Sequence, residues 1–237
     1  YKLFLESEGV CTDSRQIKKN TIFFSLKGKN FNGNLFAEQA LSQGCSFCVI
    51  DDKKYKKSEK HILVDDVLIC LQELSSLHRT KLACSVIAIT GSNGKTTSKE
   101  LISNVLSKKY NVLSTEGNLN NHIGVPLTLL KLNKNHQFAV IEMGANNLKE
   151  IELLCEIAKP NFGLITNIGK AHVEGFGSID NILKGKTELY RYLKKNNGTV
   201  FVNSDDKKLS KSASGLNSIS YGNGSMYASQ IIIDDIY

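Results

Sequence analysis

The clearest hydrophobic pattern in the chain is a short apolar run that leads through a glycine-rich turn into a helical repeat. The run Val86-Ile-Ala-Ile89 contains no polar residue, as expected of a strand buried in a parallel sheet. The turn Thr90-Gly-Ser-Asn-Gly94 follows it directly. Beyond the turn, apolar residues recur at helical spacing, which predicts one inward helix face made of Leu101, Ile102, Val105 and Leu106.

The residues before this strand form a first segment in which strands and helices alternate. Aromatic and β-branched residues predict strands at 21–26, 45–50 and 61–64. A helical pattern around Phe36 and Ala40 ends at Gly44, and another begins near Val67. We therefore predict a small α/β domain over residues 1–82.

Residues 83–237 repeat the strand–helix order several times. Helices are predicted from Pro126, around Ile151 and Leu154, and over 179–193, and Asn147 with Glu150 resembles a capping pair. The predicted strands lie at 86–89, 112–114, 139–143, 162–166, 198–202, 219–221 and 230–233. Repeated βαβ units predict a P-loop-type doubly wound, mainly parallel sheet, with ligands at the carboxyl ends of its strands.

The composition is that of an ordinary globular protein. The chain has 237 residues, of which 41% are hydrophobic and 22% are charged. No apolar run approaches the ~20 residues of a membrane-spanning helix. The first residues, Tyr1-Lys-Leu-Phe-Leu-Glu-Ser-Glu8, carry acids and lack a signal peptide's apolar core. We expect a cytoplasmic protein with no membrane partner.

The net charge of +7 does not by itself indicate a nucleic-acid binder. Such a protein concentrates its positive charge in a patch, whereas these lysines are scattered, apart from short runs such as Lys53-Lys54 and Lys194-Lys195. We expect no nucleic-acid partner, and part of the excess charge would attract a small polyanionic substrate.

Two of the six cysteines, Cys45 and Cys48, have the CxxC spacing of metal and redox sites. No second pair or His cluster completes a zinc site, and a redox CxxC pair opens a helix rather than lying in a strand. The favoured interpretation is buried, reduced thiols.

The strand, turn and helix around Lys95 have the arrangement of a phosphate-binding loop. Glycines let backbone N–H groups surround an anion, and the helix N-terminus adds partial positive charge. Lys95 would reach the terminal phosphates, and the Thr96 hydroxyl would bind Mg²⁺. The glycine spacing, Gly91-x-x-Gly94, is shorter than in GxxxxGK[ST]. The alternative is an ordinary strand-to-helix turn with a surface lysine.

Three further side chains could serve a site at the same sheet edge. Glu142 ends an apolar strand, where an unpaired carboxylate is costly, so it would meet a cation such as Mg²⁺ or else face solvent. His172 follows a strand in a loop and could bind a second Mg²⁺, although Mg²⁺ prefers oxygen. Lys186 interrupts the inward stripe of the 179–193 helix, so it either snorkels to the core edge or points into the site with a lowered pKa.

The loop Thr115-Glu-Gly-Asn-Leu-Asn-Asn-His122 is rich in amides. Asn118, Asn120 and Asn121 supply neutral donors and acceptors that could bind a phosphate or sugar edge. An Asn-stabilised turn is the alternative.

Several motifs together resemble the Mur ligases, the ATP-dependent amide-forming enzymes of peptidoglycan precursor synthesis. The phosphate loop with its short glycine spacing is similar, as are Asp13-Ser-Arg15 and the segment 26–33, in which Asn32 replaces the family's frequent Asp. The remaining motifs are Gly117-Asn-Leu-Asn-Asn121, Gly124-Val-Pro126, Ile141-Glu-Met-Gly144 and 166–178. They resemble the branch that adds D-alanyl-D-alanine to UDP-N-acetylmuramoyl-tripeptide.

The resemblance implies that ATP phosphorylates the tripeptide carboxylate and that the D-alanyl-D-alanine amine then attacks the acyl phosphate. It implies Lys95, Lys186 and His172 as catalytic residues, and Thr96, Glu142, His172 and carbamylated Lys186 as Mg²⁺ ligands. The nucleotide-binding residues it implies are Gly91, Ser92, Asn93, Gly94, Lys95, Thr96, Thr97, Asn203 and Asp206. The substrate-binding residues it implies are Ser14, Arg15, Lys27, Asn30, Asn118 and Asn121.

The resemblance also implies a domain plan. Residues 1–82 would bind the UDP-sugar, and residues 83–237 would form an incomplete central ATP-binding domain, without the family's C-terminal ligase domain. We expect a monomer. The alternatives are another Mur or folylpolyglutamate-type ligase, or a non-catalytic ATP-binding fragment of one.

Overall fold

The computed structural model describes residues 1–169 and 173–223. The chain divides into two compact units, one made of Tyr1–Leu82 with Leu129–Leu132, the other of Ala83–Thr128 with Asn133–Tyr237. Each unit contains its own parallel sheet. Among the described residues, no helix is long and apolar enough to cross a membrane.

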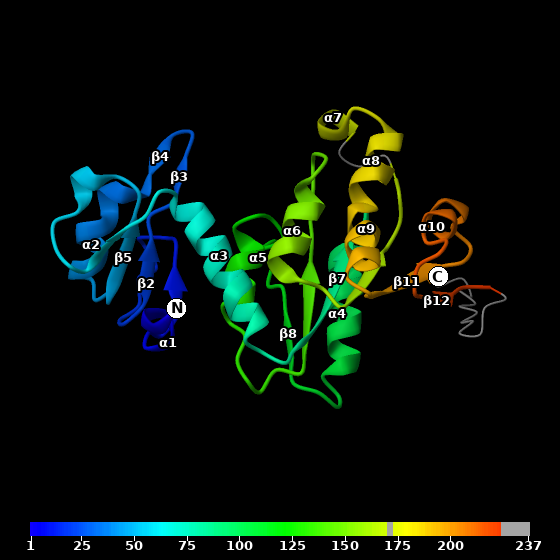
Figure 1. Ribbon diagram of the computed structural model, residues 1–237, viewed down its shortest axis with the longest axis horizontal. Coiled ribbons are helices and arrows are strands. Elements are labelled where there is room, and N and C mark those ends of the chain that lie inside the picture. Colours follow the sequence, from blue (N-terminus) through cyan, green and yellow to red (C-terminus); the bar gives the residue numbers. More distant parts are fainter. Residues whose placement is uncertain (170–172, 224–237) are drawn as a thin grey trace, which may run out of the picture. The chain divides into compact units, whose positions relative to one another are not determined.

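The first unit is built on a four-stranded sheet in the order β1-β2-β5-β6, drawn in blue and cyan in Figure 1. All three strand pairings are parallel. The strands are β1 (Val10–Cys11), β2 (Ile22–Phe24), β5 (Phe47–Ile50) and β6 (His61–Leu63), and β3 (Lys27–Gly28) with β4 (Phe31–Asn32) forms a separate antiparallel hairpin. The helices are α1 (Lys2–Leu5), α2 (Ala37–Ser42) and α3 (Val67–Thr80), with short 3₁₀ turns at Gly33–Phe36 and Lys53–Tyr55. The predicted small α/β fold is confirmed.

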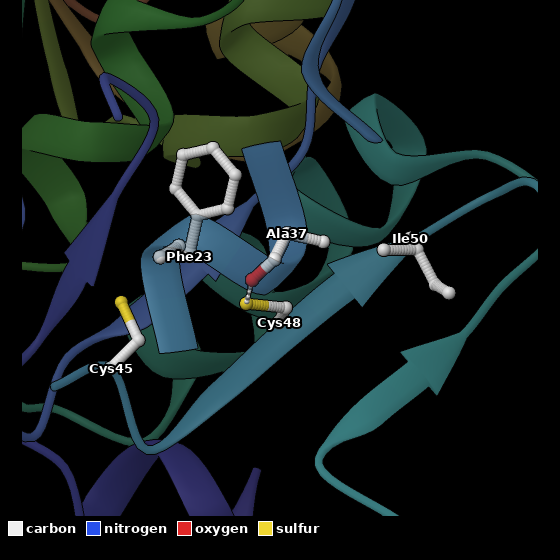
Figure 2. Packing of buried hydrophobic residues seen from close by; sticks show 6 residues of the cluster. Phe23, Ala37, Cys45, Cys48 and Ile50 are labelled. Atoms are coloured by element: carbon white, nitrogen blue, oxygen red, sulfur yellow. Dashed lines mark hydrogen bonds between the residues drawn. The ribbon is translucent and has the colours of Figure 1, made fainter. Parts of the chain in front are cut away.

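The core of this unit explains the CxxC pair. Figure 2 shows Cys45 and Cys48 packed with Phe23, Ala37 and Ile50 between α2 and the sheet. The Cys48 thiol donates to the carbonyl of Ala37 at 3.2 Å, and burial raises its pKa to about 12. All six cysteines are free. The prediction of buried, reduced thiols is confirmed for Cys45 and Cys48, because their surroundings suit small apolar groups.

The second unit is built on a six-stranded sheet in the order β12-β11-β10-β7-β9-β8, with every pairing parallel. Its strands are β7 (Ser85–Thr90), β8 (Val112–Ser114), β9 (Phe138–Glu142), β10 (Phe162–Ile165), β11 (Thr199–Asn203) and β12 (Ser218–Tyr221). The chain runs from β7 out to β8, returns through β9, and crosses to β10 on the other side of β7. The topological switch point therefore lies between the carboxyl ends of β7 and β10.

Helices cover both faces of this sheet. On one face α4 packs against β7, β8 and β9, and its residues Ile102 and Leu106 contact a cluster that includes Ile89 and Leu164. On the other face α9 packs on β10, so closely that a Cβ on Gly163 would meet Leu189 and Leu193. The helices are α4 (Lys95–Leu106), α5 (Gly124–Leu129), α6 (Glu150–Ala158), α7 (Val173–Phe176), α8 (Ile179–Lys186), α9 (Glu188–Lys195) and α10 (Lys207–Ser212). The predicted doubly wound, mainly parallel fold is confirmed.

The predicted inward face of α4 is partly wrong. Ile102 and Leu106 face the sheet, but Leu101 and Val105 are 62% and 72% exposed. Lys99 and Ser103 are buried and share the inward side of the helix with Ile102 and Leu106. The helical spacing was right, but the hydrophobic pattern alone put the stripe about one residue away from its true centre.

Other boundaries also differ from expectation. The predicted helix over 179–193 is two helices, α8 and α9, which meet at Thr187. Helix α5 begins at Gly124, two residues before Pro126. The predicted capping pair is confirmed in part. The Glu150 carboxylate accepts from the Asn146 and Asn147 amides, but the N-cap of α6 is Lys149, which makes no side-chain capping bond. The predicted strand at 230–233 lies outside the described residues.

Candidate active site

The loop between β7 and α4 has the backbone conformation that an anion site requires. Gly91 has φ +144° and Gly94 has φ +75°, a region that residues with a Cβ rarely adopt. A Cβ on Gly91 would also collide with the Thr166 hydroxyl. Helix α4 starts immediately afterwards at Lys95, so its N-terminus points into the same loop.

The loop is fastened to the segment that follows β10. The Thr166 hydroxyl donates to the carbonyl of Asn93 at 2.6 Å. The Asn167 side chain makes two hydrogen bonds with the backbone of Asn93. It accepts from the Asn93 N–H at 3.1 Å and donates to the Asn93 carbonyl at 3.0 Å. The Ser92 hydroxyl accepts from the amide of Gly169 at 2.9 Å. These contacts cross the switch point, where ligands bind in sheets of this type.

Lys95 is folded onto its own loop. Its ammonium donates to the carbonyls of Gly91 and Ser92 at 2.9 and 3.1 Å. Burial lowers the pKa of Lys95, while the nearby Glu142 carboxylate opposes that shift. The lysine is therefore a half-buried cation held within reach of the loop.

Glu142 is the point on which the neighbouring elements converge. It is the last residue of β9 and is 2% exposed. The Thr96 hydroxyl donates to Oε2 at 2.9 Å, and the Asn120 amide donates to Oε1 at 2.7 Å. The Glu142 backbone N–H donates to the Thr115 hydroxyl at 2.9 Å. The buried carboxylate is thus satisfied by donors from α4 and from the loop after β8, and the same loop also binds the Glu142 backbone.

These oxygens suit a hard divalent cation. Mg²⁺ prefers oxygen ligands and takes one or two carboxylates together with phosphates and water, which matches one carboxylate beside one hydroxyl. Among residues 1–169 and 173–223, no group of three or more His, Cys, Asp or Glu side chains could hold a metal by itself. A cation at Glu142 and Thr96 would therefore need further ligands such as phosphate oxygens.

A cleft of about 410 Å³ opens beside this carboxylate. Its lining residues are Lys95, Asn120, Asn121, His122, Gly144, Ala145, Asn146, Glu150, Leu153 and Leu154. Asn120, Asn121 and Asn146 contribute amides to this lining, and Leu153 and Leu154 of α6 contribute apolar side chains. The cleft therefore combines polar and apolar groups, as small-molecule sites do.

Lys186 points toward this region from α8. It is buried, and its ammonium donates to the carbonyl of Ala145, a cleft residue, at 3.2 Å. The ammonium also lies 5.5 Å from the centre of the Phe176 ring. Burial, and then the positive charge of Lys95, lower the pKa of Lys186 to about 8. The alternative of a lysine that snorkels to the core edge is therefore wrong.

The two residues expected on the adenosine side lie near a second, open pocket. Asn203 and Asp206 line it together with Ile168, Asp205, Lys207 and Lys208. The Asp206 carboxylate accepts from the Lys208 and Leu209 amides and caps α10. Asn203 accepts from the amide of Asp205 at 3.0 Å. Both side chains therefore stabilise the local turn.

The expected substrate residues of the first unit lie on the turn after β1 and on the β3–β4 hairpin. Arg15 is paired with Asp13 at 2.8 Å, and Ser14 beside it is buried. Lys27 forms an ion pair of 2.7 Å with Asp51, and Asn30 is exposed in the β3–β4 hairpin turn. Lys27 lies in β3 itself and Asn30 in the turn of that hairpin, whereas Ser14 and Arg15 follow β1.

The sequence did not identify which asparagine of the 115–122 loop contacts Glu142. It selected Asn118 and Asn121 as binding residues, but only Asn120 contacts Glu142. Asn121 accepts from the Ile123 and Gly124 amides and caps α5, while Asn118 is exposed. The spacing of three nearby amides does not indicate which of them faces Glu142, because the path of the loop decides it. His172 lies outside the described residues.

The sequence matches two family models, the Mur ligase middle domain over residues 89–236 and the Mur ligase family catalytic domain over residues 6–111. It is 40% identical over 235 residues to the UDP-N-acetylmuramoyl-tripeptide–D-alanyl-D-alanine ligase of Haemophilus influenzae, covering 96% of this chain and 51% of that protein. The Bacillus subtilis ligase of the same name is 40% identical over 218 residues, with 91% and 47% covered.

The fold matches solved structures of the same group. MurF from Acinetobacter baumannii superposes with a TM-score of 0.83 at 33% identity, covering 94% of this chain and 52% of that one. MurF ligase from Thermotoga maritima in complex with ADP gives 0.85 at 30% identity, with 95% and 52% covered. The chain spans about half the length of the relatives it matches. The sequence motifs, the fold and these matches agree, and the chain belongs to the Mur ligase family.

Proposed function

We propose that this protein is an ATP-dependent ligase that joins D-alanyl-D-alanine to UDP-N-acetylmuramoyl-tripeptide in peptidoglycan precursor synthesis. The names of the Haemophilus influenzae and Bacillus subtilis relatives support this activity, and the ADP complex of the Thermotoga maritima relative supports a nucleotide substrate. The observation that carries the proposal is the convergence of Thr96 and Asn120 on the buried Glu142 carboxylate, directly behind the phosphate loop.

The loop residues Gly91 to Thr97 bind the ATP phosphates. Their backbone N–H groups and the α4 N-terminus favour negative charge. Lys95 exchanges its carbonyl partners for phosphate oxygens, which brings its ammonium to the group that is transferred. Asn203 and Asp206 lie at the adenosine side, next to the open pocket.

Thr96 and Glu142 would hold Mg²⁺, and His172 and carbamylated Lys186 would hold a second ion. Mg²⁺ supplies neutralisation of the phosphate charge when it is bound. Asn120 keeps one carboxylate oxygen occupied, so Glu142 presents its other oxygen together with the Thr96 hydroxyl.

The surroundings of Lys186 suit carbamylation. A neutral amine attacks the carbon of CO₂, a nitrogen–carbon bond forms, and the nitrogen loses a proton to give a carbamate anion. The attack needs the unprotonated amine, and burial and the charge of Lys95 lower the Lys186 pKa to about 8. The product replaces a buried cation beside Lys95 with an anion able to bind metal.

In the reaction, a carboxylate oxygen of the tripeptide attacks the γ-phosphorus of ATP and ADP leaves. The amine of D-alanyl-D-alanine then attacks the acyl carbon, phosphate leaves, and the nitrogen loses a proton. Lys95 stabilises the charge on the transferred group. Ser14, Arg15, Lys27 and Asn30 would bind the UDP-sugar. Asn118 and Asn121 would also contact substrate, Asn121 from the lining of the cleft. The protein works as a cytoplasmic monomer without nucleic acid or membrane.

The test is a ligation assay with ATP, Mg²⁺ and both substrates, following phosphate release and the mass of the amide product. Because the chain spans half the length of its relatives, the assay also uses a chimera carrying the second half of the Bacillus subtilis ligase. We expect release that requires both substrates and is lost in Lys95→Ala. A chimera that binds ATP but forms no amide would refute the proposal.

A further inference from the structure

Lys99 is a buried charged residue that the proposed reaction does not use. It lies on α4 one turn after Lys95 and is 1% exposed. A lysine at an inward helix position has to lose its hydration, and an apolar residue of similar length would fill the space at lower cost. The charge therefore calls for a reason beyond packing.

The contacts of the Lys99 ammonium indicate that reason. It donates to the backbone carbonyl of Thr115 at 2.6 Å. Its other partner is the carboxylate of Glu100, also at 2.6 Å, but that side chain is 57% exposed and screened by water. The buried and directional contact is the one with Thr115.

Thr115 connects Lys99 to Glu142. It directly follows β8, and its own N–H donates to the carbonyl of Val140 at 3.0 Å. Its hydroxyl accepts from the Glu142 backbone N–H at 2.9 Å. The loop that begins at Thr115 returns with Asn120, whose amide donates to the Glu142 carboxylate. Lys99 thus fixes Thr115, the first residue of this loop. The loop contacts Glu142 twice, because Thr115 binds its backbone N–H and Asn120 binds its carboxylate.

Helix α4 therefore contacts the Glu142 region twice. Thr96 donates to the carboxylate itself, and Lys99, three residues later on the same side, holds the residue that anchors the Glu142 backbone. Figure 1 shows α4 beside β8, and α4 packs on both β8 and β9. The phosphate loop and the carboxylate are in this way tied to one rigid helix.

We propose that Lys99 is a positioning residue that holds Glu142 for metal–nucleotide binding by way of Thr115. The inference deepens the proposed function and rests on it for the role of Glu142 as a metal ligand. It makes two separate statements, one about the Glu142 backbone and one about the metal, and they can be measured separately.

The first measurement needs no nucleotide. Amide hydrogen exchange is followed by NMR in this chain, in Lys99→Met and in Glu100→Gln, which removes the exposed ion pair and leaves the Thr115 contact intact. We expect exchange at the Glu142 amide to accelerate roughly tenfold in Lys99→Met and to stay unchanged in Glu100→Gln. Unchanged exchange in a folded Lys99→Met protein would overturn the inference. If Lys99→Met does not fold, Thr115→Val, which removes only the acceptor for this amide, is compared with Thr115→Ser.

The second measurement is calorimetric binding of ADP with Mg²⁺ and with EDTA. We expect Lys99→Met to weaken the Mg²⁺-dependent affinity by roughly 10- to 100-fold, as changes around a metal ligand do. Affinity in EDTA should stay the same, a split that general loss of structure would not produce. In a double-mutant cycle, Lys99→Met should add little once Glu142→Gln is present.

The two proposals fail in different ways. If the unmodified chain shows no Mg²⁺-dependent binding, the metal role of Glu142 fails and Lys99 is left as an anchor of the backbone only, which overturns the positioning role. If binding depends on Mg²⁺ but Lys99→Met and Glu142→Gln weaken it additively, Lys99 does not act through Glu142, and the proposed function stands.

Discussion

The amide of Asn120 offers a direct test of how the Glu142 carboxylate is held. Asn120→Ala removes the donor that lies 2.7 Å from Glu142 Oε1. Hydrogen bonds to charged groups contribute about 1.5–3 kcal/mol, and the carboxylate is too buried for water to replace the lost donor freely. In a unit of roughly 150 residues that loss corresponds to a decrease in melting temperature of about 4–10 °C.

Asn118→Ala is the matched control. Asn118 lies in the same loop and is the same residue type, but its side chain is exposed, so we expect a change of at most about 0.5 kcal/mol. Asn120→Asp is a third variant, because it keeps the size of the side chain and sets a second carboxylate against Glu142. It should be less stable than Asn120→Ala at pH 7 and recover part of the difference as pH falls.

The assay is thermal unfolding by circular dichroism, with hydrogen-exchange mass spectrometry of β9 peptides to assign the signal to the second unit. The assignment matters because the two units can unfold separately. Equal losses in Asn118→Ala and Asn120→Ala would refute the reasoning, since a general effect of the loop would then explain both.

Three other predictions follow from single sites. The pKa of Lys186 is lowered from 10.5 to about 8, so the folded state binds fewer protons and its stability should rise between about pH 8 and 10.5 in CO₂-free buffer. The free energy of unfolding of Lys186→Met, measured with urea at each pH, should lack that rise. An equal rise in the variant would contradict the lowered pKa of Lys186. Gly91→Ala should lower the melting temperature and abolish calorimetric ADP binding, because its Cβ meets Thr166 and its φ is +144°. Adding Thr166→Ala to Gly91→Ala should remove the clash but not the unfavourable φ, so full recovery of stability and binding would argue against backbone strain. Cys48, with a thiol pKa of about 12, should react with an alkylating agent far more slowly than Cys11 at pH 8, as peptide mass spectrometry would show; equal rates would mean that the thiol is accessible.

The parallel sheet of the second unit was predictable because its strands carry the strongest local signals. Val86 to Ile89 and Ala139 to Ile141 are apolar runs, and a strand buried on both faces leaves few alternatives. The glycine-rich turn from β7 into α4 was predictable for a similar reason, since its glycines and lysine are close in sequence, while its role in phosphate binding stays a prediction.

The inward face of α4 was not predictable from hydrophobicity. Leu101 and Val105 are exposed while Lys99 is buried, which reverses the usual preference of each residue type. The cause is specific to the tertiary structure, because the carbonyl of Thr115 lies where the lysine ammonium can reach it. A pattern based on residue type alone cannot contain that information.

The same limit applies to Asn120 and Lys186. Three asparagines within four positions have the same chemistry, and the turn after Thr115 decides which of them faces Glu142. For Lys186 the helical stripe predicted an inward position, but the choice between the core edge and the site depended on where Ala145 lies. Contacts between distant segments decided both cases.

The two hydrogen bonds from Lys95 to Gly91 and Ser92 have a consequence for selectivity among anions. A ligand must replace both carbonyl contacts before it can use the ammonium, and it must also compete with the Asn167 side chain for the amide of Asn93. A lone phosphate or sulfate ion has to meet the Lys95 ammonium and the Asn93 amide from a single position in the loop. A polyphosphate chain can span the loop and meet these donors with separate phosphate groups. The internal hydrogen bonds of the loop therefore favour nucleotides over simple anions in solution.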